Sequence, residues 1–519
     1  MLPAADEDTG PKDGAANSGD RGPLNSGAVQ ASRLTAGQVP HRWPEWTALT
    51  LFAGLVGFAI PWHEPWSDEA QSWQLARSLS LPDLFVKYVR YEGSPGLWHL
   101  LLWALSRLHV SYSGLHWICG AIAVASTSLL VFYSPFPRYL RLILPFTYFL
   151  AFQYAIIARS YVLVPWMLFL LAFWWRKGPL RIAILLGLLA NVSLHASVIS
   201  GGLAIVYAIE QYRHRRSWDS VQRRKLLYCA LIVLGFYAIA IWTSWPAQDM
   251  PLSRVRGESR GFLLHAIESL VGGICQPWLL SIPFWIVMGW WFRARKCLVY
   301  LLPVAFFAAF SGAVFAAWWH MGLLVPLILC LLWITWPESE PRTASYAVAG
   351  RLALIYMAGV QALWLAFAVS YDHFHAFAPD LEAAQFLKPY VLKGARIAVT
   401  SDYCKETQAF NSVGILPYFD RPIFLNQPGE FWWWSANNQT EARFVQLLPT
   451  HPDIVVVETI QTHPGPPLNF DEPNVAAMIK MGYTRTRVYC GSIPERLDFL
   501  QTMCHSIFQY SPKAGSETP

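Results

Sequence analysis

Charged residues are scarce in this chain. Asp, Glu, Lys and Arg make up 14% of its 519 residues, whereas a typical soluble domain carries about 25%. Hydrophobic residues account for 54%, including 26 Trp, 30 Phe and 22 Tyr. This composition excludes a disordered chain and an ordinary cytosolic enzyme, and it indicates a polytopic membrane protein with a soluble part attached. The net charge of +6 is small for this length, and no basic stripe stands apart from the membrane pattern, which argues against nucleic-acid binding.

Cysteine is also scarce. The chain has 8 Cys residues and no CxxC pair, which excludes a disulfide scaffold. Cys404, Cys490 and Cys504 fall in the last part of the chain, where at most one pair can form among the three. Residues 371–519 also lack a phosphate loop, a GxSxG elbow and a zinc-ligand pattern.

Three regions differ in composition. Residues 1–42 are rich in Gly, Ser, Ala, Asp and Pro and predict a disordered leader. No signal-peptide pattern precedes the first apolar segment, so we expect that segment to stay in the membrane as an anchor. Residues 43–370 alternate apolar runs with short polar breaks. Since a spanning helix needs about 20 apolar residues and some runs are shorter, we expect about 11–13 transmembrane or partial helices, with broken segments at 139–157 and 261–276.

The final region, residues 371–519, carries polar residues throughout and two strand-like apolar runs, Ile397–Thr400 and Ile454–Val457. This pattern predicts a small soluble α/β domain. The expected fold class is therefore a mainly α polytopic membrane protein with a small extracytoplasmic α/β domain at its C-terminus.

The distribution of Lys and Arg predicts the orientation. The densest cluster lies between Arg213 and Lys225, so this loop is expected in the cytoplasm. Counting crossings from it places an outer loop, residues 62–95, and the C-terminal domain outside, with Arg159 at the outer face near that loop. The bacterial cytoplasmic (inner) membrane is the favoured location; a cell exterior or an endoplasmic reticulum lumen are alternative outer compartments.

The most informative stretch is Trp62–Ala70, directly after the first apolar helix. Ser67 can cap a following helix whose amphipathic run, Gln71–Leu81, would lie along the membrane surface. Asp68 and Glu69 are adjacent carboxylates: one can accept a proton from an attacking hydroxyl, and the other can steer it. Together they can hold a divalent cation, Mg or Mn, although the chemistry does not require one. The alternative is that both acids only cap an interfacial helix.

Further candidates lie in other outer segments. Glu92 is a third carboxylate at the same membrane level, and the alternative is a solvated acid at a helix-start turn. Arg159 and Tyr161 form an Arg-x-Tyr at a membrane boundary, where a planar, bidentate guanidinium suits a phosphate; the alternative is a snorkelling Arg beside an aromatic-belt Tyr. Arg254 and Arg256 lie on an outer loop, where they would meet a lipid-linked phosphate or anionic lipid headgroups.

Weaker candidates are two histidines and an aromatic run. His195 and His320 lie at outer turns and would act as ligand or acid/base groups or, more commonly, as interfacial hydrogen-bonding residues. The run Phe431–Trp434 would stack on a sugar ring or, as we favour, pack against the membrane domain. Asp372, His373 and His375 follow the last apolar helix without a strong metal-ligand signature.

Several of these residues resemble the GT-C class of glycosyltransferases. The resemblance lies in the Asp-Glu pair after the first membrane helix, the interfacial helix, the Arg-x-Tyr, and a Glu-Gly-x-Pro-x-Leu-Trp entry at Glu92–Trp98. The chain is most similar to the branch that contains protein O-mannosyltransferases and lipid A aminoarabinose transferases. It differs at Ser94 and Gly96, where that branch suggests His or Lys and a second Pro.

The resemblance implies a sugar donor carried on a polyprenyl phosphate, with Asp68 as the base or the residue that positions the acceptor. The expected function is transfer of that sugar to an extracytoplasmic glycan, lipid or protein. Two alternatives stay open. A transporter or flippase of a lipid-linked solute would need ionisable residues well inside the membrane and often shows an internal repeat. A non-catalytic envelope assembly protein would tolerate loss of the acids.

Overall fold

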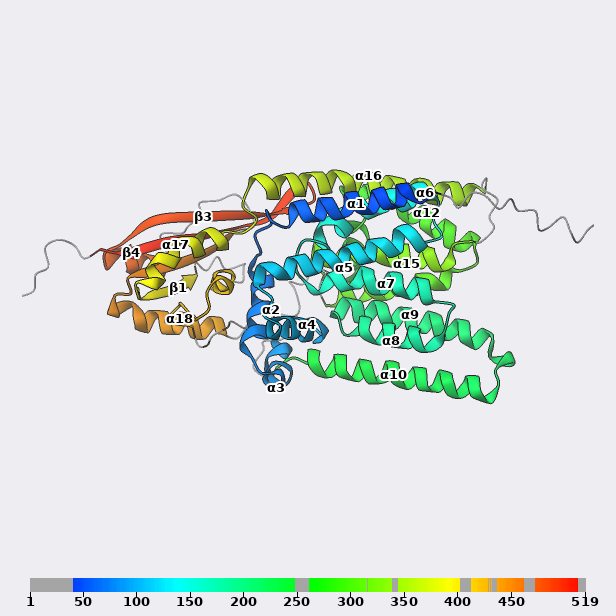
Figure 1. Ribbon diagram of the computed structural model, residues 1–519, viewed down its shortest axis with the longest axis horizontal. Helices are drawn as coiled ribbons and strands as arrows, with labels where there is room; N and C mark the ends of the chain where they lie inside the picture. Colours follow the sequence, from blue (N-terminus) through cyan, green and yellow to red (C-terminus); the bar gives the residue numbers. More distant parts are fainter. Residues whose placement is uncertain are drawn as a thin grey trace, which may run out of the picture. The chain divides into compact units, whose positions relative to one another are not determined.

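The computed structural model is mostly helical and ends in a small sheet (Figure 1). The structure describes residues 41–247, 261–314, 316–337, 344–401, 412–427, 429, 431, 436–461 and 472–511. The chain divides into two units, Met1–Pro44 and Glu45–Pro519, and all features below belong to the second, except that α1 begins at Trp43. Residues 1–40 of the leader, Arg254, Arg256, Cys404 and Trp432–Trp434 lie outside the described residues.

The described residues between 41 and 374 contain sixteen α-helices. Their bounds are α1 (Trp43–Ala59), α2 (Ser67–Ser78), α3 (Leu81–Asp83), α4 (Leu97–Arg107), α5 (Tyr112–Tyr133), α6 (Arg138–Ile143), α7 (Leu163–Trp174), α8 (Pro179–Ala190), α9 (Leu194–Arg213), α10 (Ser220–Ser244), α11 (Phe262–Gly272), α12 (Ser281–Ala294), α13 (Leu302–Ala313), α14 (Trp318–Met321), α15 (Leu324–Thr335) and α16 (Ser345–Phe374).

Within the described part of the chain, four stretches of helix are long and apolar enough to cross a membrane, judged by length and composition alone. They are α5, α10, the continuous α14–α15 stretch Trp318–Thr335, and α16. α16 has 30 residues and therefore extends about 45 Å at about 1.5 Å per residue. Shorter apolar helices of 10–17 residues accompany them, at Ser160–Trp174, Pro179–Ala190, Phe262–Gly272 and Leu298–Ala313.

The predicted break in the segment 139–157 is confirmed. The chain there forms three short pieces, α6, η4 (Leu144–Phe146) and η5 (Phe149–Gln153). Pro145 lies in η4, where its ring and missing N–H interrupt the helical hydrogen bonds. Almost every residue from Leu144 to Ala158 is buried, so this irregular backbone is covered by other parts of the protein.

The C-terminal sheet has four strands in the order β1-β2-β4-β3. Both predicted strands are present, as β1 (Ile397–Ser401) and β2 (Ile454–Gln461), and they pair in parallel. β3 (Tyr483–Glu495) and β4 (Asp498–Tyr510) form an antiparallel hairpin that the sequence did not predict. β3 has a largely exposed polar first half, so no apolar run marks it. Cys490 and Cys504 face each other in this hairpin and form a disulfide.

Helices cover both faces of this sheet. They are α17 (Asp380–Leu392), α18 (Ala436–Leu447) and α19 (Pro473–Lys480). One face packs with Leu387 of α17, and the other packs with Phe444 of α18 and Met478 of α19. All five residues of β1 are consequently buried, as is usual for a strand covered on both sides.

The helix after the first apolar segment begins one residue earlier than predicted. The N-cap of α2 is Trp66 rather than Ser67. Glu69 explains the shift, because its carboxylate accepts a hydrogen bond from the backbone N–H of Trp66 at 3.2 Å and so stabilises this start. The predicted amphipathic run 71–81 is covered by protein, since most of α2 is buried, including Trp73 and Leu75; its place along a membrane surface stays a prediction. It packs against α4 and against η11 (Val413–Tyr418) of the C-terminal region.

Candidate functional site

Asp68 and Arg159 form an ion pair, although they lie on separate segments of the chain. Asp68 is in the first turn of α2, and Arg159 is the residue before η6 (Ser160–Val162). Their side chains are 15% and 23% exposed respectively, so the pair remains accessible. The Arg159 guanidinium also lies 5.5–5.8 Å from the ring centres of Trp66, Tyr161 and Trp319, within the range of cation–π attraction.

A backbone contact aligns the two segments. The N–H of Ala158 donates to Oε2 of Glu69 at 2.5 Å. Two consecutive residues, Ala158 and Arg159, are thereby held against two consecutive acids, Asp68 and Glu69. The arrangement fixes the position of the guanidinium through main-chain geometry and not only through the ion pair.

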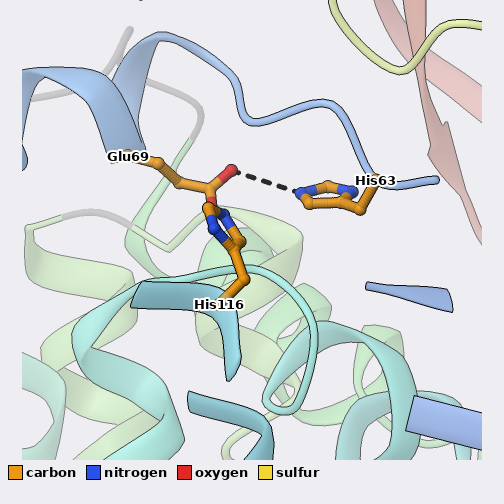
Figure 2. A group of neighbouring side chains, drawn as sticks. All are labelled: His63, Glu69 and His116. Atoms are coloured by element: carbon orange, nitrogen blue, oxygen red, sulfur yellow. Dashed lines mark hydrogen bonds and ion pairs between the residues drawn. The ribbon is translucent and has the colours of Figure 1, made fainter. Parts of the chain in front are cut away.

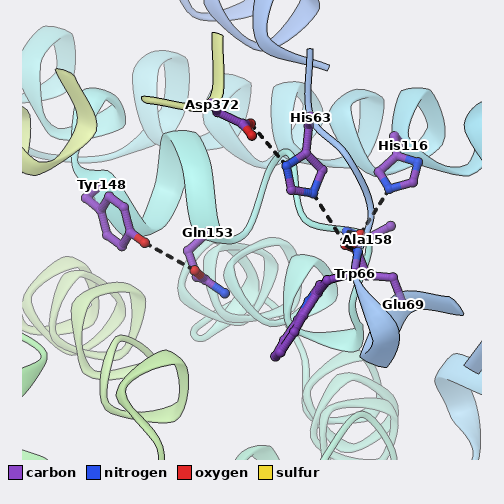
Figure 3. A network of polar contacts seen from close by, with 8 residues as sticks. All are labelled: His63, Trp66, Glu69, His116, Tyr148, Gln153, Ala158 and Asp372. Atoms are coloured by element: carbon purple, nitrogen blue, oxygen red, sulfur yellow. Dashed lines mark hydrogen bonds and ion pairs between the residues drawn. The ribbon is translucent and has the colours of Figure 1, made fainter. Parts of the chain in front are cut away.

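Glu69 is fully buried and is held by four donors. Oε1 lies 3.2 Å from the N–H of Trp66 and 3.3 Å from Nε2 of His63. Oε2 accepts from Ala158 and lies 3.0 Å from Nε2 of His116 (Figure 3). Burial alone would raise the pKa of Glu69, but the hydrogen bonds from His116 and His63 outweigh it and hold the pKa well below the ordinary value. Glu69 is therefore an inward-facing anion with no exposed side-chain surface.

His63 connects Glu69 to Asp372 at the end of α16. Its Nδ1 lies 3.1 Å from Oδ2 of Asp372 (Figure 3). Burial would lower the pKa of His63, but the carboxylates of Asp372 and Glu69 outweigh it and raise the pKa to about 10. Asp372 and His373 are neighbours in the sequence but have different surroundings: His373 packs against Phe58 and Trp62.

Glu92 lies near Asp68, although it comes from the C-terminal end of the loop 62–95. Its Oε1 accepts a hydrogen bond from Nε2 of Gln71 at 2.5 Å. Burial, and then the negative charge of Asp68, raise the pKa of Glu92 to about 8. Burial also raises the pKa of Asp68, and Arg159 offsets part of that rise. Asp68 pairs with a guanidinium, whereas Oε2 of Glu92 lies 3.9 Å from Nε2 of His99.

Gly96 explains one departure from the GT-C pattern. A Cβ at this position would lie 2.4 Å from a ring carbon of Phe85, a distance that side chains do not tolerate. The aromatic ring of Phe85 thus occupies the space that a second proline would need.

Tyr161 and His195 meet through His320. The hydroxyl of Tyr161 lies 2.7 Å from Nε2 of His320, whose Nδ1 accepts the N–H of Ala317 at 2.9 Å. His195 stacks on His320 with ring centres 4.0 Å apart. Because Nδ1 of His320 is an acceptor, its neutral ring carries the proton on Nε2 and donates it to Tyr161. These three residues are buried beside Arg159.

A polar pocket of about 270 Å³ lies further along α2. It begins roughly two turns beyond Asp68. Its lining residues come from α2 and from the C-terminal region: Gln74, Arg77, Ser78, Leu416, Asp420, Arg421 and Pro422. Gln74 is 1% exposed and its Oε1 has no hydrogen-bond partner among the described residues.

The sequence did not single out His63, His116 or Asp372 as partners of Glu69. His63 lies within the informative stretch, so its place beside the acids was a usable signal. His116 is in the second turn of the apolar helix α5 and Asp372 is 309 residues from His63, and neither position carries a local pattern. No protein-family model, curated protein or solved structure matches this chain.

Proposed function

We propose that this protein is an integral membrane glycosyltransferase that moves a sugar from a polyprenyl-phosphate donor to an extracytoplasmic acceptor. The observation that carries the proposal is the Asp68–Arg159 pair. The partly exposed carboxylate of Asp68 at the start of α2 lies against the guanidinium of Arg159, next to aromatic rings such as that of Trp66. This combination suits a reaction that removes a proton from a hydroxyl and releases a phosphate.

In the proposed step, Asp68 accepts the proton of the acceptor hydroxyl. The acceptor oxygen forms a bond with the anomeric carbon while the bond from that carbon to the phosphate oxygen breaks. The electron pair of that bond leaves with the polyprenyl phosphate. Arg159 stabilises the departing anion, since only part of its five-donor guanidinium is engaged by Asp68. A divalent cation shared by Asp68 and Glu69 is left out of this step, because Asp68 faces Arg159 and both oxygens of Glu69 face inward.

The acceptor, a glycan, lipid or protein, would approach through the polar pocket along α2. Arg77, Asp420 and Arg421 give this pocket charges of both signs. Its wall is shared with the C-terminal region, so that region would help to select the acceptor. Arg254 and Arg256 are proposed as further contacts to the donor phosphate.

The proposed topology has 11–13 crossing or partial helices, a cytoplasmic loop at Arg213–Lys225, and residues 371–519 outside a bacterial inner membrane. The N-terminus of α10 at Ser220 tests it, because a cysteine placed there should react only with reagent from the cytoplasmic side. A background without Cys404 and the five cysteines that the structure shows as free thiols provides the control. Labelling of that cysteine from outside would overturn the orientation.

The decisive experiment compares envelope glycans and glycolipids by mass spectrometry in cells with and without the gene. It is followed by transfer of a labelled sugar from its polyprenyl-phosphate carrier to the identified acceptor by the protein in proteoliposomes. We expect a missing sugar in the deletion strain and transfer by the wild type. If the labelled lipid instead crosses the bilayer without transfer, the protein is a flippase.

A further inference from the structure

Two imidazoles converge on one buried carboxylate in the loop that follows α1. Nε2 of His63 lies 3.3 Å from Oε1 of Glu69, and Nε2 of His116 lies 3.0 Å from Oε2 (Figure 2). The three potential ligand atoms all lie within 4.8 Å of one another. Two ligands at about 2.0–2.2 Å from one Zn²⁺ ion are at most about 4.4 Å apart. Small rotations of the imidazoles would therefore bring all three ligands onto one ion.

The groups around His63, Glu69 and His116 are arranged like the second shell of a metal site. His63 presents Nε2 to Glu69 and its other nitrogen, Nδ1, to the carboxylate of Asp372 at 3.1 Å. Metal-binding histidines commonly direct their second nitrogen to a carboxylate in this way. The oxygens of Glu69 are oriented in turn by the N–H groups of Trp66 and Ala158.

The charges of the cluster also match a divalent cation. Glu69 and Asp372 supply two buried negative charges. One divalent ion with two neutral imidazoles balances them. Asp68 and Arg159 next to the cluster compensate each other and leave this balance unchanged.

We propose that His63, Glu69 and His116 bind one Zn²⁺ ion that fastens the loop of Asp68 to the helix bundle. Two nitrogens and one carboxylate oxygen form a ligand set for zinc, whereas Mg²⁺ and Ca²⁺ favour all-oxygen sites. The site differs from an Asp68–Glu69 cation site, since Asp68 faces Arg159. The three ligands are at most 6% exposed, which indicates a structural role. Through Asp372 the ion also connects the loop and α5 to the end of α16.

The test measures bound metal and does not depend on the proposed transferase activity. The full chain, purified in detergent without chelator, should contain about one equivalent of zinc by elemental analysis. After chelation, added Zn²⁺ should raise the melting temperature, and Mg²⁺ at the same concentration should not. Co²⁺ added to the chelated wild type should give the visible absorption of a four-coordinate site, which provides a readout without any variant.

Variants separate this site from adventitious binding. His116→Gln and Glu69→Gln should lose at least nine tenths of the bound zinc. Asp372→Asn should weaken zinc binding about 10–100-fold. His375→Gln alters an exposed histidine and should retain the full amount. Wild-type protein with little zinc and no Zn²⁺-dependent change in melting would overturn the proposal and assign the cluster to hydrogen bonding alone. Transferase activity in metal-free protein would leave the proposed function intact.

Discussion

Asp68 and Glu69 are neighbours in the sequence but occupy opposite environments. Asp68 is 15% exposed and pairs with one guanidinium, whereas Glu69 has no exposed side-chain surface and faces four donors. Successive residues on an α-helix point about 100° apart, so one acid faces the accessible side of α2 and the other faces the bundle. A pair of adjacent acids is thus divided into a group available for chemistry and a group that holds the loop in place.

The first prediction tests the accessible member of this pair. Asp68→Asn keeps the size of the side chain but removes its charge and its ability to accept a proton. Sugar transfer should fall about 10²–10⁴-fold. Stability should stay within about 1 kcal/mol, because the burial that raises the pKa of Asp68 offsets most of what its pairing with Arg159 contributes. Activity in proteoliposomes and thermal unfolding in detergent are the two measurements.

The exposed acid Asp83 provides the control for this experiment. It lies in the same loop and pairs with Lys87 at 2.8 Å. Asp83→Asn should keep full activity. Near-normal turnover by Asp68→Asn would remove the base from the mechanism and favour the transporter or assembly alternatives.

The second prediction tests the buried member. In Glu69→Gln, an amide N–H₂ group replaces one acceptor oxygen and faces donors, so the unfolding free energy should fall by about 3 kcal/mol. The activity of the protein that remains folded should fall less than in Asp68→Asn. Denaturant unfolding and activity per folded molecule separate the two effects. Equal stability of Glu69→Gln and wild type would contradict the holding role of this carboxylate.

The same contrast shows what the sequence could predict. Local patterns identified the two acids, the break at Pro145 and both parallel strands, because each depends on residues close together in the chain. Counting crossings placed Arg159 near the outer loop, and the structure puts it against Asp68.

The environment of Glu69 could not be predicted in this way. His63, His116 and Asp372 come from three separate segments, and only packing brings them together. The start of α2 was misplaced for a related reason, since the capping contact comes from Glu69 inside the helix and not from Ser67 before it. The β3–β4 hairpin was missed because half of β3 is exposed and polar.

The third prediction concerns the partner of Asp68. Arg159→Lys keeps the positive charge but loses the planar fork, so the KM for the lipid donor should rise about tenfold, and Arg159→Ala should raise it further. Arg107→Lys is the control, because Arg107 contacts the backbone of Leu79 in the same region and should leave KM unchanged. An unchanged KM in both Arg159 variants would assign this residue to anchoring the loop.

The last prediction adds Glu92 as a third carboxylate and has the smallest expected effect. Its pKa rises from an ordinary 4.5 to about 8 on folding, so the folded protein keeps a proton that the unfolded chain releases. Wild-type stability should therefore decrease as the pH rises from about 4.5 to about 8 and level off above this range. Glu92→Gln cannot ionise at this position and lacks this decrease. The melting temperature of Glu92→Gln minus that of the wild type should therefore increase from pH 5 to pH 8. Asp83→Asn should run parallel to the wild type. A parallel profile for Glu92→Gln would mean that Glu92 is ionised in the folded protein, in which case Arg159 would have to compensate two acids rather than Asp68 alone.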